Sequence, residues 1–209
     1  MTTSDPNAIA IAIGATFFAH ILTLILGWLI VTQLKKYPFF KMIGWHWGGF
    51  RFWHAILLLI GIFTAVLILS NVLGSADNEM LKILRSSRRA VFIVAFLATF
   101  SAPFVEELVY RGVLYSAFQK TFNKTVAVIF VTTVFASVHF LQYYPDYTSL
   151  ISITLLSLVI TLIRVKTDNL LPCVVFHTLI NGIQSILLLL APYLPEPLDP
   201  TKPLNGFFQ

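Results

Sequence analysis

Six apolar runs constrain this sequence more than any other feature. Several reach about 18 residues or more, the length that a helix needs to cross the hydrocarbon layer of a bilayer. The sequence therefore predicts an all-α fold, a polytopic transmembrane helical bundle. The expected spans are roughly 8–34, 52–73, a third that starts at Val91 and carries Glu106 and Glu107, then 126–140, 149–163 and 170–190. The fourth and fifth runs are short, so we expect their helices to extend into flanking residues or to be tilted.

Composition indicates the same class. Of the 209 residues, 57% are hydrophobic and 11% are charged, whereas a soluble domain carries about 25% charged residues. The net charge of +5 needs no nucleic acid as a partner, because basic residues flanking membrane helices on the cytoplasmic side produce the same excess. Membrane lipids are the expected surroundings. The single cysteine, Cys173, excludes an intramolecular disulfide.

The segments between and after the spans predict three parts of the chain. Residues 1–90 hold two transmembrane helices, an interfacial segment at 35–51 that is rich in Lys, Arg and Trp, and an amphipathic surface helix at 78–89. Residues 91–190 hold a core of four helices. Residues 191–209 contain five prolines and should be an extended tail.

The distribution of Lys and Arg predicts the orientation. The loops on one side of the predicted bundle carry eight of these residues and those on the other side carry five, which places both termini outside and the first loop in the cytoplasm. Residues 1–34 contain no Lys or Arg, and the first apolar run is too long for a cleavable signal peptide. We therefore expect a multi-pass integral membrane protein, in the plasma or inner membrane if the source is bacterial.

The third span contains the most informative charges. Glu106, Glu107 and Arg111 are the only charged residues between Val91 and Lys120, and inside a bilayer such groups must face protein or a water-filled cavity. On a helix Glu107 and Arg111 share a face, while Glu106 is rotated by about 100°. We expect Arg111 to pair with Glu107, which leaves Glu106 for chemistry. A buried pair that only locks helix packing would need one carboxylate, not two.

Three more polar residues lie in spans that are otherwise apolar. His139 lies in the fourth span, and His177 and Asn181 share one face of the sixth because they are four residues apart. At about 1.5 Å per residue, these side chains and Glu106 can reach a similar depth. A lone histidine in a membrane helix forms an interhelical hydrogen bond about as often as it is catalytic, and a lone asparagine is more often a packing residue than a catalytic one. We expect Cys173 to be a buried packing residue, Tyr110 and Tyr143 to be interfacial or core aromatics, and His20 and His46 to have no part in chemistry.

Together a carboxylate, two histidines and an asparagine suit hydrolysis of an acyl bond by water. Glu106 can act as a general base, a histidine can share that role or protonate the leaving amine, and Asn181 with the other histidine can hold the developing oxyanion. The sequence contains no His-Glu-x-x-His zinc motif, no Glu-x-x-His pair of di-iron bundles at this stretch and no Gly-x-Ser-x-Gly elbow.

These residues form three motifs in order, Glu106-Glu107-x-x-x-Arg111, Phe135-x-x-x-His139 and His177-x-x-x-Asn181. The set resembles the signature of the CAAX-protease and bacteriocin-processing (CPBP, or Abi) family of intramembrane glutamic endopeptidases, which includes type II CAAX prenyl proteases, and it covers about residues 90–190. The resemblance implies that Glu106 and His139 activate water, that His177 and Asn181 form the oxyanion site, and that Glu107 and Arg111 support them. It implies no cofactor and no metal, and a membrane-associated peptide or prenylated protein as substrate.

Two other interpretations remain open at this point. The protein could be a non-catalytic membrane subunit of the same fold that binds a partner in a larger membrane complex, with the C-terminal tail as a contact. It could also be a metal-dependent hydrolase in which Glu106, His139 and His177 are the ligands, because one carboxylate and two imidazoles form a reasonable metal set.

Overall fold

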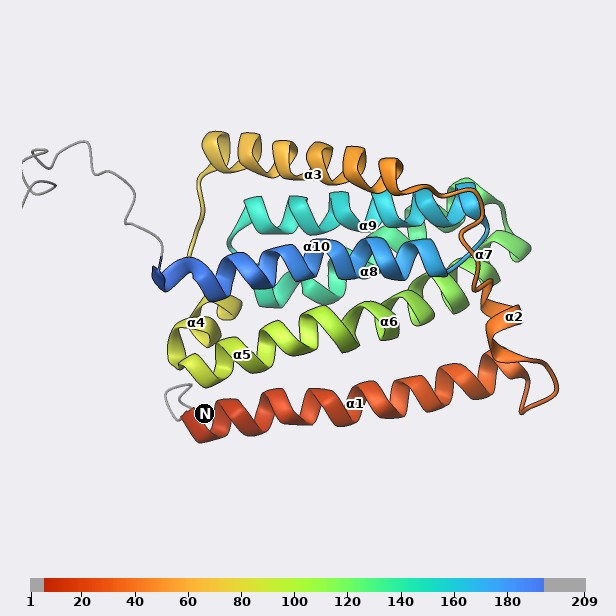
Figure 1. Cartoon of the computed structure of the whole chain (residues 1–209), viewed down its shortest axis with the longest axis horizontal. Helices are drawn as coiled ribbons and strands as arrows, with labels where there is room; N and C mark the ends of the chain where they lie inside the picture. The colour runs from red at the N-terminus through yellow and green to blue at the C-terminus, as the bar shows by residue number, and fades with distance from the viewer. Residues whose placement is uncertain (1–5, 194–209) are drawn as a thin grey trace, which may run out of the picture.

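The computed structural model describes residues 6–193, and these residues form a bundle of helices with no strand. The long helices run side by side along the long axis of the molecule (Figure 1). The α-helices are α1 (Pro6–Thr32), α2 (Phe39–Ile43), α3 (Phe52–Leu73), α4 (Glu79–Ser86), α5 (Arg88–Phe96), α6 (Ala102–Glu107), α7 (Tyr115–Thr121), α8 (Lys124–Tyr143), α9 (Tyr147–Thr167) and α10 (Leu171–Leu190). Two π-helical segments, η1 (Leu97–Ser101) and η2 (Leu108–Leu114), join α5, α6 and α7 into one continuous helix, and a short 3-10 turn, η3 (Ala191–Tyr193), follows α10.

Six of these helical stretches are long and apolar enough to cross a membrane, which confirms the predicted class. The second span begins and ends where the sequence predicts. The fourth and fifth are longer than their apolar runs, at 20 and 21 residues, because polar residues at their ends, such as Asn123 and Asp146, cap the helices beyond the apolar stretch. The third is a composite helix of 34 residues, 88–121.

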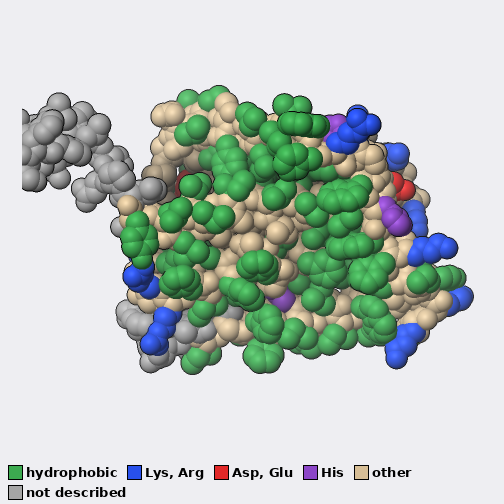
Figure 2. Space-filling model, in the orientation of Figure 1, with side chains coloured by type: hydrophobic (Ala, Val, Ile, Leu, Met, Phe, Trp, Pro, Cys, Tyr) green, Lys and Arg blue, Asp and Glu red, His purple; other side chains and the backbone are tan. Residues whose placement is uncertain are grey.

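The surface of the bundle matches a membrane environment. Hydrophobic side chains cover the long middle part of the face shown in Figure 2, and Lys and Arg gather at the two ends. The short connecting helices also lie at the two ends of the bundle, with α2 and α7 at one end and α4 at the other (Figure 1). The protein is therefore a multi-pass integral membrane protein. Which end faces the cytoplasm stays a prediction.

Two helices are peripheral and the others form the core. Helix α1 packs against η2, α2, α5 and α6, and helix α3 packs chiefly against α9; they lie along opposite edges of the bundle (Figure 1). Only 6% of the apolar window of each is buried, against 33% for the third, fifth and sixth spans. The predicted division at residues 90 and 190 stays a prediction.

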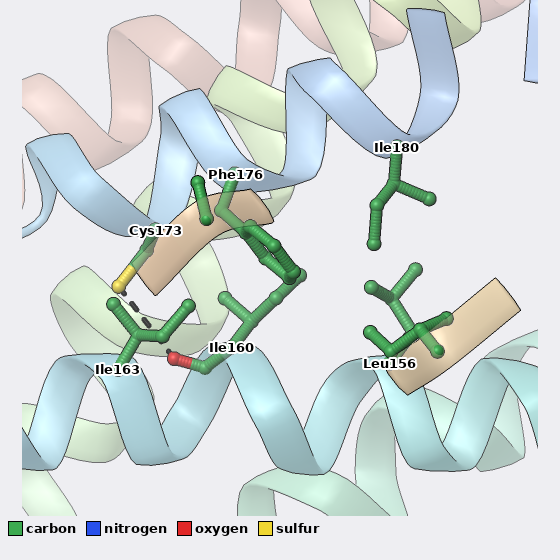
Figure 3. Close-up of a cluster of buried hydrophobic side chains, with 8 residues drawn as sticks. Leu156, Ile160, Ile163, Cys173, Phe176 and Ile180 are labelled. Carbon is green, nitrogen blue, oxygen red and sulfur yellow. Dashed lines mark hydrogen bonds between the residues drawn. The ribbon is translucent and has the colours of Figure 1, made fainter. Parts of the chain in front are cut away.

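A cluster of buried side chains holds α3, α9 and α10 together (Figure 3). Its members from α9 and α10 include Leu156, Ile160, Phe176 and Ile180. Cys173 belongs to this cluster and its Sγ lies 3.6 Å from the carbonyl oxygen of Ile160. As expected, the cysteine is a buried packing residue.

The segments outside the spans differ in part from the prediction. The surface helix expected at 78–89 ends at Ser86, because the Ser87 side chain accepts a hydrogen bond from the Ala90 amide and caps a new helix. Arg88 and Arg89 therefore begin the third span. The interfacial segment 35–51 contains the short helix α2. The tail predicted to be extended over 191–209 begins instead with the 3-10 turn η3, and its remainder, from residue 194 onward, lies outside the described residues.

Candidate active site

The third span departs from regular α-helical geometry on both sides of the two glutamates. Within η1 the Ala102 amide donates to the carbonyl of Leu97, five residues earlier, and η2 shows the same i to i−5 pattern between Tyr115 and Tyr110. The sequence prediction treated this span as one regular helix, which is wrong. Pro103 accounts for the first irregularity, since it has no amide hydrogen and disrupts the α-helical ladder.

This irregularity supplies the partner of Asn181. In the π register the carbonyl of Ala98 would accept from residue 103, but that residue is Pro103 and has no donor. The freed carbonyl instead accepts a hydrogen bond of 2.8 Å from Asn181 Nδ2. A carbonyl inside the bundle needs such a partner. Asn181 on α10 therefore supplies the hydrogen bond that Pro103 on the third span cannot donate.

Glu107 and Arg111 form the buried ion pair that the sequence predicts. Both side chains are fully buried, and Arg111 Nη1 donates to Glu107 Oε1 at 2.8 Å. The other two guanidinium nitrogens also donate hydrogen bonds. Nη2 donates to the carbonyl oxygen of Ser157 at 2.8 Å and to its Oγ at 2.9 Å, and Nε donates to Thr161 Oγ1 at 3.2 Å. The guanidinium carbon lies 5.0 Å from the ring centre of Phe135. The pair therefore joins the third span to α8 and α9.

His177 connects this ion pair to the second carboxylate. Its Nδ1 lies 2.8 Å from Glu107 Oε1 and its Nε2 lies 3.8 Å from Glu106 Oε2. The buried carboxylate of Glu107 accepts from Nδ1–H, which fixes the orientation of the ring. The other ring nitrogen then faces Glu106.

The two adjacent glutamates thus have different surroundings. Glu107 is completely inaccessible, while the side chain of Glu106 retains 23% of its exposure. Glu106 lines a cavity of about 360 Å³ inside the bundle. His139, His177 and Asn181 line the same cavity. The structure therefore places all four sequence-predicted catalytic residues around one space.

His139 is positioned by its own helix. Its Nδ1 lies 2.8 Å from the carbonyl oxygen of Phe135, one turn earlier, and its ring stacks on the Phe135 ring with centroids 4.7 Å apart. Because a carbonyl only accepts, Nδ1 carries the hydrogen and a neutral ring has its lone pair on Nε2. His139 can therefore accept a proton at Nε2.

Sequence reasoning missed several residues of the cavity wall. His20 lines it from α1, and its Nδ1 lies 2.9 Å from Ser101 Oγ. His20 therefore lies beside the predicted site residues, which the sequence did not indicate; that it has no part in the chemistry stays a prediction. Tyr143 lines the cavity as well, and so do the polar residues Gln142, Ser152 and Gln184. Like Glu106, His20 is an ionisable residue in an apolar span, and that property was the available signal.

Among the described residues, no group of three His, Cys, Asp or Glu side chains is arranged to hold a metal ion. Glu106, His139 and His177 share the cavity, and Nδ1 of each histidine is hydrogen-bonded to a protein oxygen. In the described part of the chain these three side chains are not grouped as metal ligands.

Comparison with known proteins gives one match. Residues 88–183 match the profile of a family described as "Rce1-like: Type II CAAX prenyl endopeptidase Rce1-like". No curated protein and no solved structure gives a significant match. The matched segment contains all six sequence-predicted site residues, and it starts at the first residue of α5. The segment from Arg88 to Ile183, slightly less than half of the chain, is therefore similar to the Rce1-like type II CAAX prenyl endopeptidases.

Proposed function

We propose that the protein is an intramembrane endopeptidase that hydrolyses a peptide bond of a membrane-associated substrate with water activated by Glu106 and His139. The observation that carries the proposal is the single cavity around which α6, α8 and α10 place Glu106, His139, His177 and Asn181. Similarity of the matched segment to a family of CAAX prenyl proteases supports a protease activity.

Glu106 is suited to be the general base because it is the carboxylate with access to the cavity. Glu107 is completely buried, and its Oε1 accepts from both Arg111 and His177, so burial keeps this carboxylate away from water in the cavity. In the first step Glu106, helped by His139 Nε2, takes a proton from water while the water oxygen bonds to the substrate carbonyl carbon. The C=O π electrons move to the carbonyl oxygen, which becomes an oxyanion.

His177 and Asn181 are suited to stabilise that oxyanion. The Asn181 amide has two hydrogens and uses one on Ala98, which leaves the second as a donor. When the His177 ring is doubly protonated, Nε2 also carries a hydrogen and donates toward the cavity. Two donors on one helix face, held by contacts behind them, are preorganised for a charge that develops in the transition state.

Collapse of the intermediate completes the reaction. The C–N bond breaks, its electron pair goes to nitrogen, and the proton held by Glu106 or His139 passes to the leaving amine. The products are a carboxylate and an amine. Glu107 and Arg111 act as positioning residues, because they orient His177 and join the third span to α9.

The cavity wall suggests an amphiphilic substrate. Apolar residues of α3, α5, η1 and α9, such as Ile62, Val94 and Leu156, line it beside the polar group. A prenylated peptide combines a lipid chain with a peptide bond, so it fits both surfaces. We infer a prenylated C-terminal peptide as the substrate class, in keeping with the description of the matched family.

The proposal is tested with purified protein in detergent and a prenylated CAAX peptide, with the unprenylated peptide alongside. Glu106→Gln should lower hydrolysis by at least ~10²-fold with an unchanged melting temperature. The control Glu79→Gln, an exposed carboxylate on the surface helix α4, should be fully active. Persistent activity in Glu106→Gln would remove the assignment.

The two alternatives give different results in the same assay. A metal-dependent enzyme should lose activity with chelator and regain it with added Zn²⁺, whereas the proposed mechanism predicts no effect of chelator. A non-catalytic subunit should cleave neither peptide even as wild type.

A further inference from the structure

A second concave site lies between α3 and α9, away from the candidate catalytic cavity. It has a volume of about 450 Å³ and shares no lining residue with that cavity. The hydrophobic cluster of Figure 3 lies between the two: Leu156 and Ile180 face the catalytic cavity, while Ile163 lines the groove. We call this second site the α3–α9 groove.

The walls of the groove are apolar along most of its length. Leu58, Val159 and Ile163 form its inner surface. Leu57 and Leu162 form its rim and are 67% and 44% exposed. Because both helices cross the membrane, the rim residues face the hydrocarbon layer. A lipid chain is the molecule that meets such a surface there.

One end of the groove is polar and carries hydrogen-bond donors. Lys166, in the last turn of α9, is exposed and lines this end together with His54. The Arg51 backbone amide donates to His54 Nδ1 at 3.0 Å, so a neutral His54 ring carries its hydrogen on Nε2 and can donate there. None of the residues described as lining the groove is acidic. The charge at this end therefore complements an anion.

The polar end is closed by backbone. Gly48 and Gly49 have φ of +56° and +80°, a conformation that favours glycine. A Cβ on Gly48 would lie 2.6 Å from the carbonyl oxygen of Thr167, so this loop is pressed against the end of α9. Gly49 has open space where its Cβ would be. Gly49 and Lys166 line the same groove.

We propose that the α3–α9 groove binds one anionic phospholipid. An acyl chain lies between Leu57, Leu58 and Val159, and the phosphate lies beside Lys166 and His54. This proposal rests on the continuity of an apolar, lipid-facing groove with a cationic end at the level of the helix ends, where a phospholipid carries its phosphate.

The bound lipid has a structural consequence for α3. This helix packs chiefly against α9, and a lipid in the groove extends its contacts with that helix. Further along α3, Ile62 and Val66 line the candidate catalytic cavity. A lipid that fixes α3 therefore also fixes one wall of that cavity. Binding of the lipid itself requires no protease activity.

Native mass spectrometry of the full chain in neutral detergent tests the proposal, with phosphatidylglycerol and phosphatidylcholine of identical chains as probes. The wild type should retain phosphatidylglycerol at lower lipid concentration. Lys166→Gln should weaken phosphatidylglycerol binding about fivefold, the effect of one lysine near a phosphate, and leave phosphatidylcholine unchanged. The matched control is Lys124→Gln, an exposed lysine at the start of α8 that does not line the groove; it should bind like wild type.

A second variant tests the apolar part. Leu162→Trp fills the rim and should weaken binding of both lipids. Equal effects of Lys166→Gln and Lys124→Gln, or no preference for phosphatidylglycerol in the wild type, would overturn the proposal. A rise in melting temperature with glycerol phosphate equal to that with phosphatidylglycerol would also overturn it, because a headgroup alone would then suffice.

Discussion

The helices of the matched segment and the two helices outside it use opposite means of packing. The third span, α9 and α10 are joined by hydrogen bonds and a buried ion pair among Glu107, Arg111, Ser157 and His177. Helices α1 and α3 are apolar on most sides and are largely exposed. In a bilayer, apolar side chains gain little by leaving lipid, so polar contacts and close packing hold helices together. The contrast teaches that the polar network defines the core of this bundle.

The largest effect should come from breaking that network. Glu107→Gln leaves the Arg111 guanidinium buried without a counter-ion, which should lower the free energy of unfolding by roughly 3–5 kcal/mol. The exposed pair of Glu79 and Lys82 offers the control, because Glu79→Gln removes the same charge where solvent screens it. Thermal unfolding of both variants in detergent makes the measurement.

A different outcome would change the roles of the two glutamates. If Glu107→Gln melts like the wild type but is inactive, Glu107 is the general base and Glu106 the supporting residue. If both variants melt alike and both are active, the buried pair contributes nothing to either property, and the comparison between core and periphery fails.

Much of this core could be predicted from the sequence. The number of spans and the pairing of Glu107 with Arg111 follow from the cost of charge in lipid, which restricts charged residues to the protein interior. The common location of Glu106, His139, His177 and Asn181 follows less directly, from the helical rise and the order of the spans. These features depend on chemistry that a bilayer constrains strongly.

Other features depend on packing that hydropathy does not encode. The π-helical segments were missed, although Pro103, three residues before Glu106, was a signal of an irregular helix. His20 was missed because α1 is apolar all round, so its sequence does not show which face meets the third span. Its partner Ser101 is 81 residues away in the chain, and no local pattern predicts such a contact.

Two residues of α10, Asn181 and Ser185, allow the oxyanion proposal to be tested. Asn181 and Ser185 lie one turn apart, and each donates to a carbonyl of the third span, Asn181 to Ala98 and Ser185 to Ala95. Only Asn181 is among the residues that line the cavity. Asn181→Ala should lower kcat by about 10²–10³-fold with KM little changed, whereas Ser185→Ala should leave kcat near the wild-type value. Steady-state kinetics on the peptide separates the two.

Equal losses of kcat in both variants would indicate that Asn181 acts by holding α10 against the third span. A loss of activity in Asn181→Ala that appears in KM and not in kcat would indicate substrate binding in place of transition-state stabilisation.

The smallest expected effect is a difference in stability between variants of the two peripheral helices, α1 and α3. Helix α1 approaches the core closely at Gly27, where an added Cβ would lie 2.8 Å from Leu108 Cδ2. Leu108 is completely buried and cannot move aside freely, so Gly27→Ala should destabilise the protein by about 1–3 kcal/mol through overpacking. Gly61 on α3 has no atom within 4 Å of the added Cβ, and Gly61→Ala should leave the melting temperature unchanged or slightly higher. Equal destabilisation by the two variants would show that α3 is docked as tightly as α1. The contrast in packing between the two peripheral helices would then fail.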